Sequence, residues 1–537
     1  MAHKGRDRYL KISKDSVFYN ALVLSSSGVA LQILGFVYRI YLSRLAGAEG
    51  LGVYRLVLPV FTIVISATLT GVRLAVTRLS ADMRTHSDGP AIRSLTRSCI
   101  LIFLLLFAVC AWPLVQYNHV ISAHILGDER TGPALIIFMG VIFLAGFEGI
   151  FESLFLGIRK TKYTAISNLL EQGVQFAAVL GLLYCLRNGD HARTAALIVS
   201  GLVISEIPVV IWLSLAYRHE LCGRNACPRP RKVGRGLFTR ILAIAFPVSC
   251  SSVFTNILSA ASTVLLPQRL MCAGLSRQEA VSALGIVSGM AQPLITLPMV
   301  LATSLANVLL PHLSQSLSQG RREDVRRKIQ KAFQATGLII LPATAIIVPL
   351  APSLSRLLYG QDLSEVYVIL LAISAILMDY QMICMSILNG LGLQKQGMFY
   401  IIVGEACQLA VTYFVAALPQ VHIYGYLAGM VVSPLIVVVA SLWLIRRRFG
   451  LWPRAVASGL VPIVAAVVVG LCTRIFHLSL LARNLGDFGA IILTLLGSVG
   501  LYLFLFPALG LHPLRYIRTL IPRHQKDFSV LADSQNP

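Results

Sequence analysis

Long apolar runs separated by short polar segments dominate this chain. About fourteen runs of roughly 20 to 28 residues occur, and a helix of about 20 residues crosses the hydrocarbon core of a bilayer. Because a helix satisfies its backbone hydrogen bonds within one segment, these runs predict an all-α, polytopic membrane protein. The predicted spans are 16–42, 51–77, 98–117, 132–156, 165–186, 195–217, 241–266, 282–310, 333–354, 363–388, 399–418, 424–445, 455–475 and 488–509.

The composition supports a membrane location. Hydrophobic residues make up 56% of the chain and charged residues only 13%, against roughly 25% charged in an ordinary soluble domain. A soluble core could not hide this much apolar surface, so we expect lipid to cover much of it.

Lysine and arginine residues alternate between crowded and sparse connecting segments. With the N-terminus placed in the cytoplasm, 34 of the 46 basic residues fall in the tails and even-numbered connections, and nine in the odd-numbered ones. This asymmetry follows the positive-inside rule and predicts a multi-pass membrane protein with both termini cytoplasmic. The net charge of +23 therefore reflects topology first and attraction to anionic lipid headgroups second. The placement of the basic residues therefore does not predict nucleic-acid binding.

Sequence motifs of soluble enzymes are absent. The chain has no Walker-type loop, no His-Glu-x-x-His and no Gly-x-Ser-x-Gly, so we expect no enzyme activity and no cofactor. Cys222 and Cys227 share one basic connection but lack a second ligand pair, which argues against a metal site. The first apolar run is too long for a cleaved signal peptide and is expected to remain as a helix.

Internal repetition divides the predicted bundle. A shift of 233–234 residues places Gly52 on Gly285 and Glu171 on Glu405. A shift of six helices preserves orientation, so these are parallel repeats about an axis along the membrane normal. The predicted parts are an N-terminal lobe with the inter-lobe linker in residues 1–230, a C-terminal six-helix lobe in 231–450, and an appended helix pair with a basic tail in 451–537.

Three arginines lie inside the predicted spans, where a charged side chain costs about 2.5–3.5 kcal/mol on insertion scales. Arg39 lies in the first run, and Arg55 and Arg73 lie near opposite ends of the second. Each is a candidate for binding substrate in a cavity. The alternative is a structural role, with Arg55 and Arg73 extending their side chains toward the membrane surfaces.

Six carboxylates also fall within the predicted spans: Glu148, Glu152, Glu171, Glu206, Asp379 and Glu405. Glu148 and Glu152 are four residues apart and share a helix face. Together with Asp379 they are candidates for coupling transport to H⁺ or Na⁺. A structural hydrogen-bonding role is the alternative for Asp379. Glu171 and Glu405 are candidates for the cavity, or else pair with nearby lysines at the cytoplasmic surface.

Three sequence segments resemble a known family. They are Leu-Ser-Arg-Leu-Ala-Gly-Ala-Glu-Gly-Leu-Gly-Val-Tyr at 42–54, Leu-Leu-Pro-Gln-Arg-Leu-Met-Cys-Ala-Gly at 265–274, and 285–294 continuing to 310–314. With fourteen spans as two six-helix lobes plus two, the chain resembles the MATE-like multidrug/oligosaccharidyl-lipid/polysaccharide (MOP) exporter superfamily, in its polysaccharide-flippase branch. The resemblance covers essentially residues 14–510.

The resemblance implies a flippase that works by alternating access of two lobes around a central cavity. Its cargo would be a lipid-pyrophosphate-linked saccharide, a precursor of peptidoglycan or another polysaccharide, moved across the cytoplasmic membrane for spore-cortex or cell-wall synthesis. Gln32 stands where lipid II flippases of the superfamily carry an arginine, so it joins the cavity candidates, and the family's cationic cavity does not carry over residue by residue.

Two other functions stay open. A cation-coupled multidrug antiporter would use the intramembrane carboxylates for drug cations and for H⁺ or Na⁺. A non-transporting scaffold of a wall-synthesis complex would show no transport after purification. Net positive charge in the cavity near Arg39, Arg55 and Arg73 would favour a pyrophosphate lipid as the cargo. Net negative charge there would favour cationic drugs.

Overall fold

The computed structural model describes residues 17–85, 89–186, 190–222, 235–450, 461–483 and 486–508. Throughout these ranges the regular structure is helical, as the apolar runs predict. The elements are α1 (Val17–Ile65), η1 (Ser66–Thr70), α2 (Gly71–Thr85), α3 (Gly89–Gln116), α4 (Asn118–Val120), η2 (Ile121–Ile125), η3 (Glu129–Thr131), α5 (Gly132–Gly157), α6 (Thr161–Leu186), α7 (His191–Cys222), α8 (Arg235–Cys272), α9 (Arg277–Leu284), η4 (Gly285–Ala291), α10 (Gln292–Ile295), α11 (Met299–Ser318), α12 (Arg322–Tyr359), α13 (Glu365–Gly390), α14 (Gln394–Val415), α15 (Ile423–Phe449), α16 (Val461–Ala482) and α17 (Asp487–Ala508).

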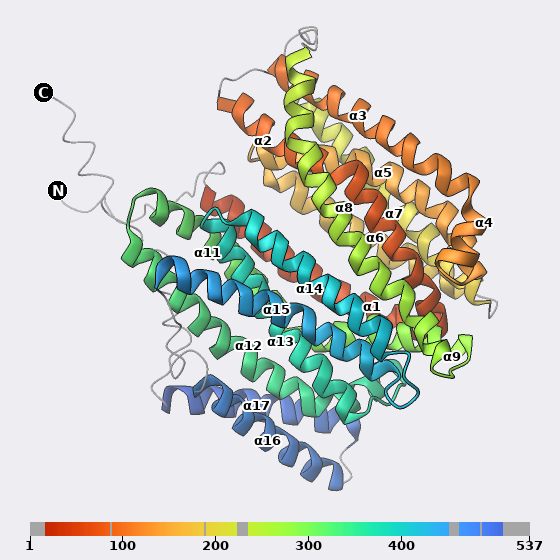
Figure 1. Cartoon of the computed structure of the whole chain (residues 1–537), viewed down its shortest axis with the longest axis vertical. Helices are drawn as coiled ribbons and strands as arrows, with labels where there is room; N and C mark the ends of the chain where they lie inside the picture. Colours follow the sequence, from red (N-terminus) through yellow and green to blue (C-terminus); the bar gives the residue numbers. More distant parts are fainter. Residues whose placement is uncertain are drawn as a thin grey trace, which may run out of the picture. The chain divides into compact units, whose positions relative to one another are not determined.

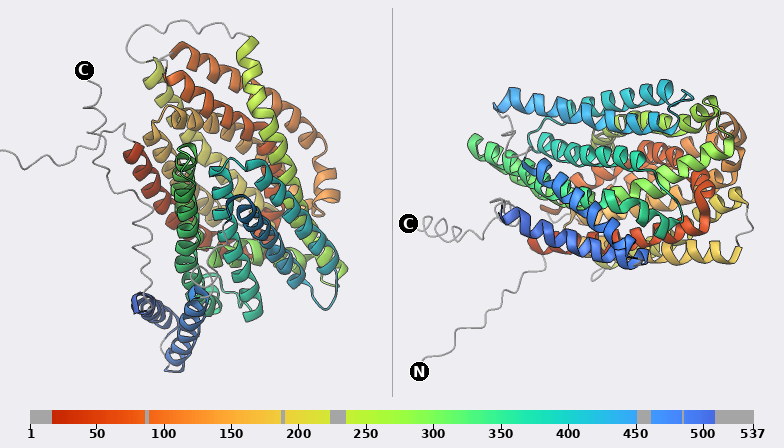
Figure 2. Two further views of the ribbon diagram at one scale, coloured as in Figure 1. Left: turned by 60° about the vertical axis from the view of Figure 1, so that its left-hand side comes forward. Right: turned by 90° about the horizontal axis from the view of Figure 1, so that it is seen from below.

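The helices form two compact units, each a bundle of helices running side by side (Figures 1 and 2). The first unit contains the chain as far as Met290 together with Ala417–Gln420, and the second contains Ala291–Ala416 and the chain from Val421 onward. Helices α8 and α9 belong to the first unit because α8 packs on α1 and α2, and α9 packs on α1. The lobes predicted from the repeat, with boundaries after residues 230 and 450, stay a prediction.

Twelve helices in the described ranges are long and apolar enough to cross a membrane, or thirteen if the bent pair 277–295 and 299–306 forms one span. The multi-pass membrane prediction is confirmed, whereas the count of fourteen is not. The second predicted run, 51–77, and the last part of the first, 16–42, fall within one continuous candidate span, Leu31–Met83. The termini, predicted to be cytoplasmic, lie outside the described residues.

Gly47 divides α1 into two arms. Its φ of 71° and ψ of 172° are not helical, and glycine adopts this region because it has no Cβ. The helix before Gly47 carries Arg39 and the helix after it carries Arg55. The kink therefore places two intramembrane arginines on different arms of one element.

Helix α5 lies at the core of the first unit, packed against α2, α3 and α7. Its Ile150 and Leu154 are fully buried. A Cβ on Gly146 would come within 1.9 Å of the Phe103 ring, so α3 approaches α5 closely only because this residue lacks a side chain. This packing sets the orientation of α5, and with it the direction in which the helix presents Glu148 and Glu152.

Repeat-related segments cross at close range within the first unit. A Cβ on Gly52 would lie 2.1 Å from the carbonyl oxygen of Val281, and one on Gly285 would lie 1.9 Å from that of Ala48. The same shift of 233 residues relates Gly52 to Gly285 and Ala48 to Val281. A contact of this reciprocal form is expected where equivalent segments meet on a two-fold axis. We call these four residues the glycine crossing.

In the second unit, a polar cluster joins the terminal helix pair α16–α17 to α12. His477 is buried and lies 2.9 Å from Ser353 Oγ and 3.2 Å from Thr494 Oγ1. The Tyr502 hydroxyl donates a hydrogen bond of 2.8 Å to the carbonyl oxygen of Leu338. These contacts hold the appended pair against its neighbour in an otherwise apolar setting.

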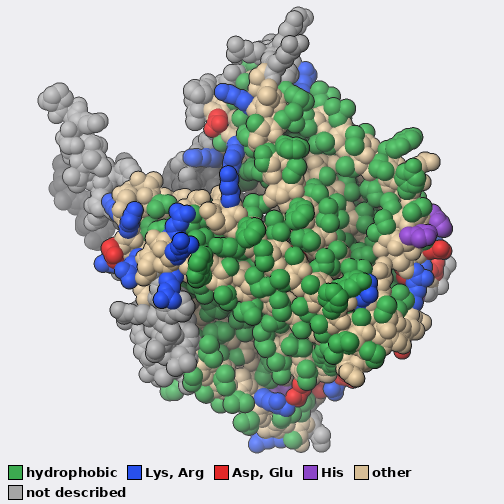
Figure 3. All heavy atoms as spheres, in the orientation of Figure 1, with side chains coloured by type: hydrophobic (Ala, Val, Ile, Leu, Met, Phe, Trp, Pro, Cys, Tyr) green, Lys and Arg blue, Asp and Glu red, His purple; other side chains and the backbone are tan. Residues whose placement is uncertain are grey.

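The surface of the described chain is strongly apolar. Hydrophobic side chains cover most of the face drawn in Figure 3, and lysine and arginine gather mainly near its margins. On α3, Leu101, Leu105, Val109 and Trp112 are three or four residues apart and 61–74% exposed. An exposed apolar stripe of this size fits contact with lipid chains.

Candidate functional site

The residues singled out from the sequence are divided between the two units. The first unit contains Gln32, Arg39, Arg55, Arg73, Glu148, Glu152 and Glu171, and the second contains Asp379 and Glu405. Contacts within each unit decide which of them act together.

Arg39 and Arg55 share one electrostatic environment, although the kink at Gly47 separates them along α1. Both guanidinium charges act on the hydroxyl groups of Tyr38 and Tyr54. Arg39 is exposed and Arg55 is half-buried. Tyr38 is buried, so the two guanidinium groups, and not its hydroxyl, are the groups suited to phosphate oxygens.

Helix α6 faces this part of α1 and supplies aromatic and amide groups. Phe176 lies 6.3 Å from Tyr38 between ring centroids, and a Cβ on Gly35 would lie 3.8 Å from Gln172 Oε1. Gln32 is exposed one turn before Gly35. Aromatic and amide side chains next to guanidinium groups are suited to a sugar–phosphate headgroup.

Arg73 is paired, which the sequence did not reveal. Its Nη2 lies 2.5 Å from Glu152 Oε2, with side-chain exposures of 44% and 18%. The bond joins α2 to α5. A candidate for substrate binding and a candidate for ion coupling therefore neutralise one another within the first unit.

A cluster of buried carboxyl groups lies between α5, α6 and α7. Glu148 and Glu206 are 9% and 6% exposed, and their carboxyl groups lie within hydrogen-bonding reach of each other. Glu171 on α6 and Glu152 on α5 add further negative charge, and Arg73 faces the cluster from α2. Glu206 had no predicted role, because only the packing of α5 on α7 reveals its partner.

The two carboxylates of the second unit have different surroundings. Asp379 on α13 is 2% exposed, and its Oδ1 has no hydrogen-bond partner among the described residues. Glu405 on α14 accepts a long bond of 3.5 Å from Ser433 Oγ on α15. Asp379 remains a candidate for ion coupling and Glu405 for the cavity.

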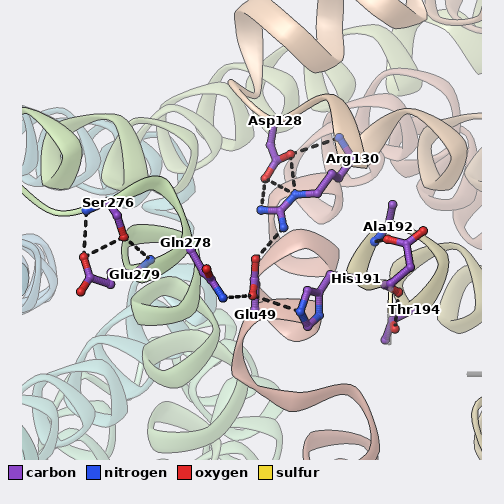
Figure 4. A network of polar contacts seen from close by, with 10 residues as sticks. Glu49, Asp128, Arg130, His191, Ala192, Thr194, Ser276, Gln278 and Glu279 are labelled. Carbon is purple, nitrogen blue, oxygen red and sulfur yellow. Dashed lines mark hydrogen bonds and ion pairs between the residues drawn. The ribbon is translucent and has the colours of Figure 1, made fainter. Parts of the chain in front are cut away.

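A second polar network that the sequence did not predict surrounds Glu49 (Figure 4). Glu49 accepts bonds from Arg130 at 2.5 Å and from Gln278 at 2.9 Å, and it lies 3.0 Å from His191 Nε2. Asp128 holds Arg130 through a bond of 2.8 Å. The network links α1, η3, α7 and α9 next to the glycine crossing, since Glu49 lies between Ala48 and Gly52 and Gln278 lies one turn before Val281.

Among the described residues, no group of three histidine, cysteine, aspartate or glutamate side chains is arranged to hold a metal ion.

Two family models match the chain. The model described as polysaccharide biosynthesis protein matches residues 17–317, and MatE matches residues 247–414. Stage V sporulation protein B of Bacillus subtilis (strain 168) is 23% identical over 430 residues, which cover 79% of this chain and 83% of that protein.

Solved structures share the helical architecture. A multidrug resistance MATE family transporter of the MOP superfamily, in an inward-facing conformation, has a TM-score of 0.65 at 15% identity, covering 80% of this chain and 98% of that chain. Lipid II flippase MurJ, in an inward closed conformation, has a TM-score of 0.65 at 12% identity, covering 90% of this chain and 97% of that chain. At these identities the likeness concerns the fold.

Proposed function

Because the chain belongs to the polysaccharide biosynthesis protein family, we propose that it moves a lipid-pyrophosphate-linked saccharide across the bacterial cytoplasmic membrane. It is a membrane flippase of the MOP superfamily and not an enzyme. The proposed cargo is a precursor of peptidoglycan or another polysaccharide, for spore-cortex or cell-wall synthesis. Stage V sporulation protein B, a relative named for sporulation, supports that setting.

The observation that carries the proposal is the position of Arg39 and Arg55 on the two arms of α1, near the hydroxyls of Tyr38 and Tyr54. A sugar–pyrophosphate headgroup cannot enter hydrocarbon without partners for its charges. Guanidinium groups give phosphate oxygens short, charge-assisted hydrogen bonds. The polyprenyl chain of such a cargo would stay in lipid beside the exposed apolar helices.

Transport by alternating access also requires elements that separate and close again. The glycine crossing and the Glu49 network join the kinked region of α1 to α9 through close backbone contact and polar bonds. By the topology predicted from the basic residues, this junction lies on the outer side of the membrane. We propose that it opens once in each transport cycle.

The runner-up function is a cation-coupled multidrug antiporter. The buried carboxyl cluster around Glu148 and Glu206 favours it, because carboxylates in a membrane suit cationic drugs as well as H⁺ or Na⁺. Against it, Arg39 and Arg55 place positive charge in the same unit, which opposes entry of a cation.

Reconstitution in liposomes tests the proposal. The purified chain would be combined with a fluorescent undecaprenyl-pyrophosphate-linked disaccharide-pentapeptide, and a membrane-impermeant reagent would report the leaflet that holds the label. We expect translocation that depends on the protein and is lost in an Arg39→Ala/Arg55→Ala double variant. Absence of lipid movement together with ion-driven efflux of cationic dyes would instead establish the antiporter.

A further inference from the structure

The pair Glu148–Glu206 is an unusual arrangement for a membrane interior. Both residues are at least nine-tenths buried, on helices α5 and α7. Glu206 Oε2 is inaccessible to solvent and finds no hydrogen-bond donor among the described residues. Its carboxyl group nevertheless lies within hydrogen-bonding reach of that of Glu148.

The carboxyl groups of Glu148 and Glu206 need a proton or another cation between them, because ionised carboxylates offer only hydrogen-bond acceptors. Two ionised carboxylates this close would repel strongly in a medium of low dielectric constant. One proton turns the repulsion into a short O–H···O hydrogen bond and supplies the donor that Glu206 lacks. The protein itself offers no other donor to this oxygen in the described part.

Charges on the neighbouring helices do not neutralise the pair. Arg73 faces it from α2, but its guanidinium group is bonded to Glu152. Glu152 from α5 and Glu171 from α6 face the pair with negative charge. A larger cation such as Mg²⁺ or Ca²⁺ takes six or more oxygen ligands, and the described residues present no metal-binding group.

We propose that Glu148 and Glu206 bind one proton between them and release it during each transport cycle, so that this pair couples transport to a proton gradient. The binding site stands on the geometry of the first unit alone, whereas the coupling rests on the proposed function. Glu171, half-buried beside Glu206, is placed to receive the departing proton. Glu152, which is held by Arg73, has no part in the exchange.

Proton binding is tested without transport, by infrared spectroscopy of the purified, full-length protein near neutral pH. We expect a carboxylic-acid C=O band that is lost from the difference spectrum in both Glu148→Gln and Glu206→Gln. Glu220→Gln is the matched control, because it changes a glutamate on α7 that is ion-paired with Lys160 and lies outside the carboxyl cluster, and it should leave that band in place. Size-exclusion profiles of all three variants show whether each folds. A band of unchanged intensity in both folded variants would overturn the proposal.

Coupling is tested in the same liposomes by imposing a pH gradient. We expect the gradient to accelerate transport several-fold in the wild-type protein and to have no effect in Glu148→Gln or Glu206→Gln. Wild-type transport that ignores the gradient would overturn the coupling. If no cargo moves at all, the proposed function fails, and the infrared band still decides whether the pair holds a proton.

Discussion

Charged side chains inside the first unit contact residues that lie far from them along the chain. Arg39 and Arg55 stand out because a charge within an apolar run is costly. The bond between Arg73 and Glu152 joins residues 79 positions apart, and the contact between Glu148 and Glu206 depends on how α5 packs on α7. Sequence position alone cannot say which buried charges compensate one another.

Removing either arginine of α1 should abolish most transport. For Arg39→Ala or Arg55→Ala we expect a fall of about ten- to hundredfold in the rate of lipid flipping, since a hydrogen bond to a charged group contributes about 1.5–3 kcal/mol. Arg39→Lys should lose less, because it keeps the charge and gives up the two-pronged contact. Normal flipping by both alanine variants, inserted at wild-type levels, would contradict the headgroup role.

Replacing only one member of the Arg73–Glu152 pair should destabilise the protein more than replacing both. Arg73→Ala leaves a carboxylate that is 18% exposed without its partner, whereas the double variant Arg73→Ala/Glu152→Ala leaves no orphan charge. We expect the double variant to melt at a higher temperature than the less stable single variant in detergent. Losses that simply add would show that the two residues are not coupled.

Helix α1 acts through its kink and through the glycine crossing. The sequence shift that pairs Gly52 with Gly285 marks the segments around them as equivalent. In the structure Gly52 packs against Val281 in the second segment, and Gly285 packs against Ala48 in the first. Neither the kink at Gly47 nor the contact between the repeats could be predicted, because both depend on tertiary packing and not on hydropathy.

The glycine crossing tolerates no side chain at its centre. Gly52→Ala and Gly285→Ala would each place a methyl group about 2 Å from a backbone carbonyl oxygen, and overpacking of this kind costs about 1–3 kcal/mol. We expect lower thermal stability and slower flipping in both. Gly173→Ala on α6, where no atom lies within 4 Å, is the matched control, and equal behaviour of all three variants would refute the crossing's role.

The whole molecule is an all-α membrane protein, as the apolar runs predict, and its superfamily is the one that the sequence segments indicate. The count of fourteen spans stays unconfirmed, because the first two apolar runs meet in one kinked helix. The length of an apolar run determines which segments enter the bilayer. It does not determine which helix faces bring charged residues together.

The most direct measurement of the central claim compares two cargoes in liposomes. They would carry the same saccharide on the same polyprenol, one through pyrophosphate and the other through a neutral glycosidic bond. We predict that the pyrophosphate-linked lipid moves at least about tenfold faster, a difference of about 1.4 kcal/mol. The difference should vanish in the Arg39→Ala/Arg55→Ala variant. Equal rates for the two lipids in the wild-type protein would contradict recognition of pyrophosphate.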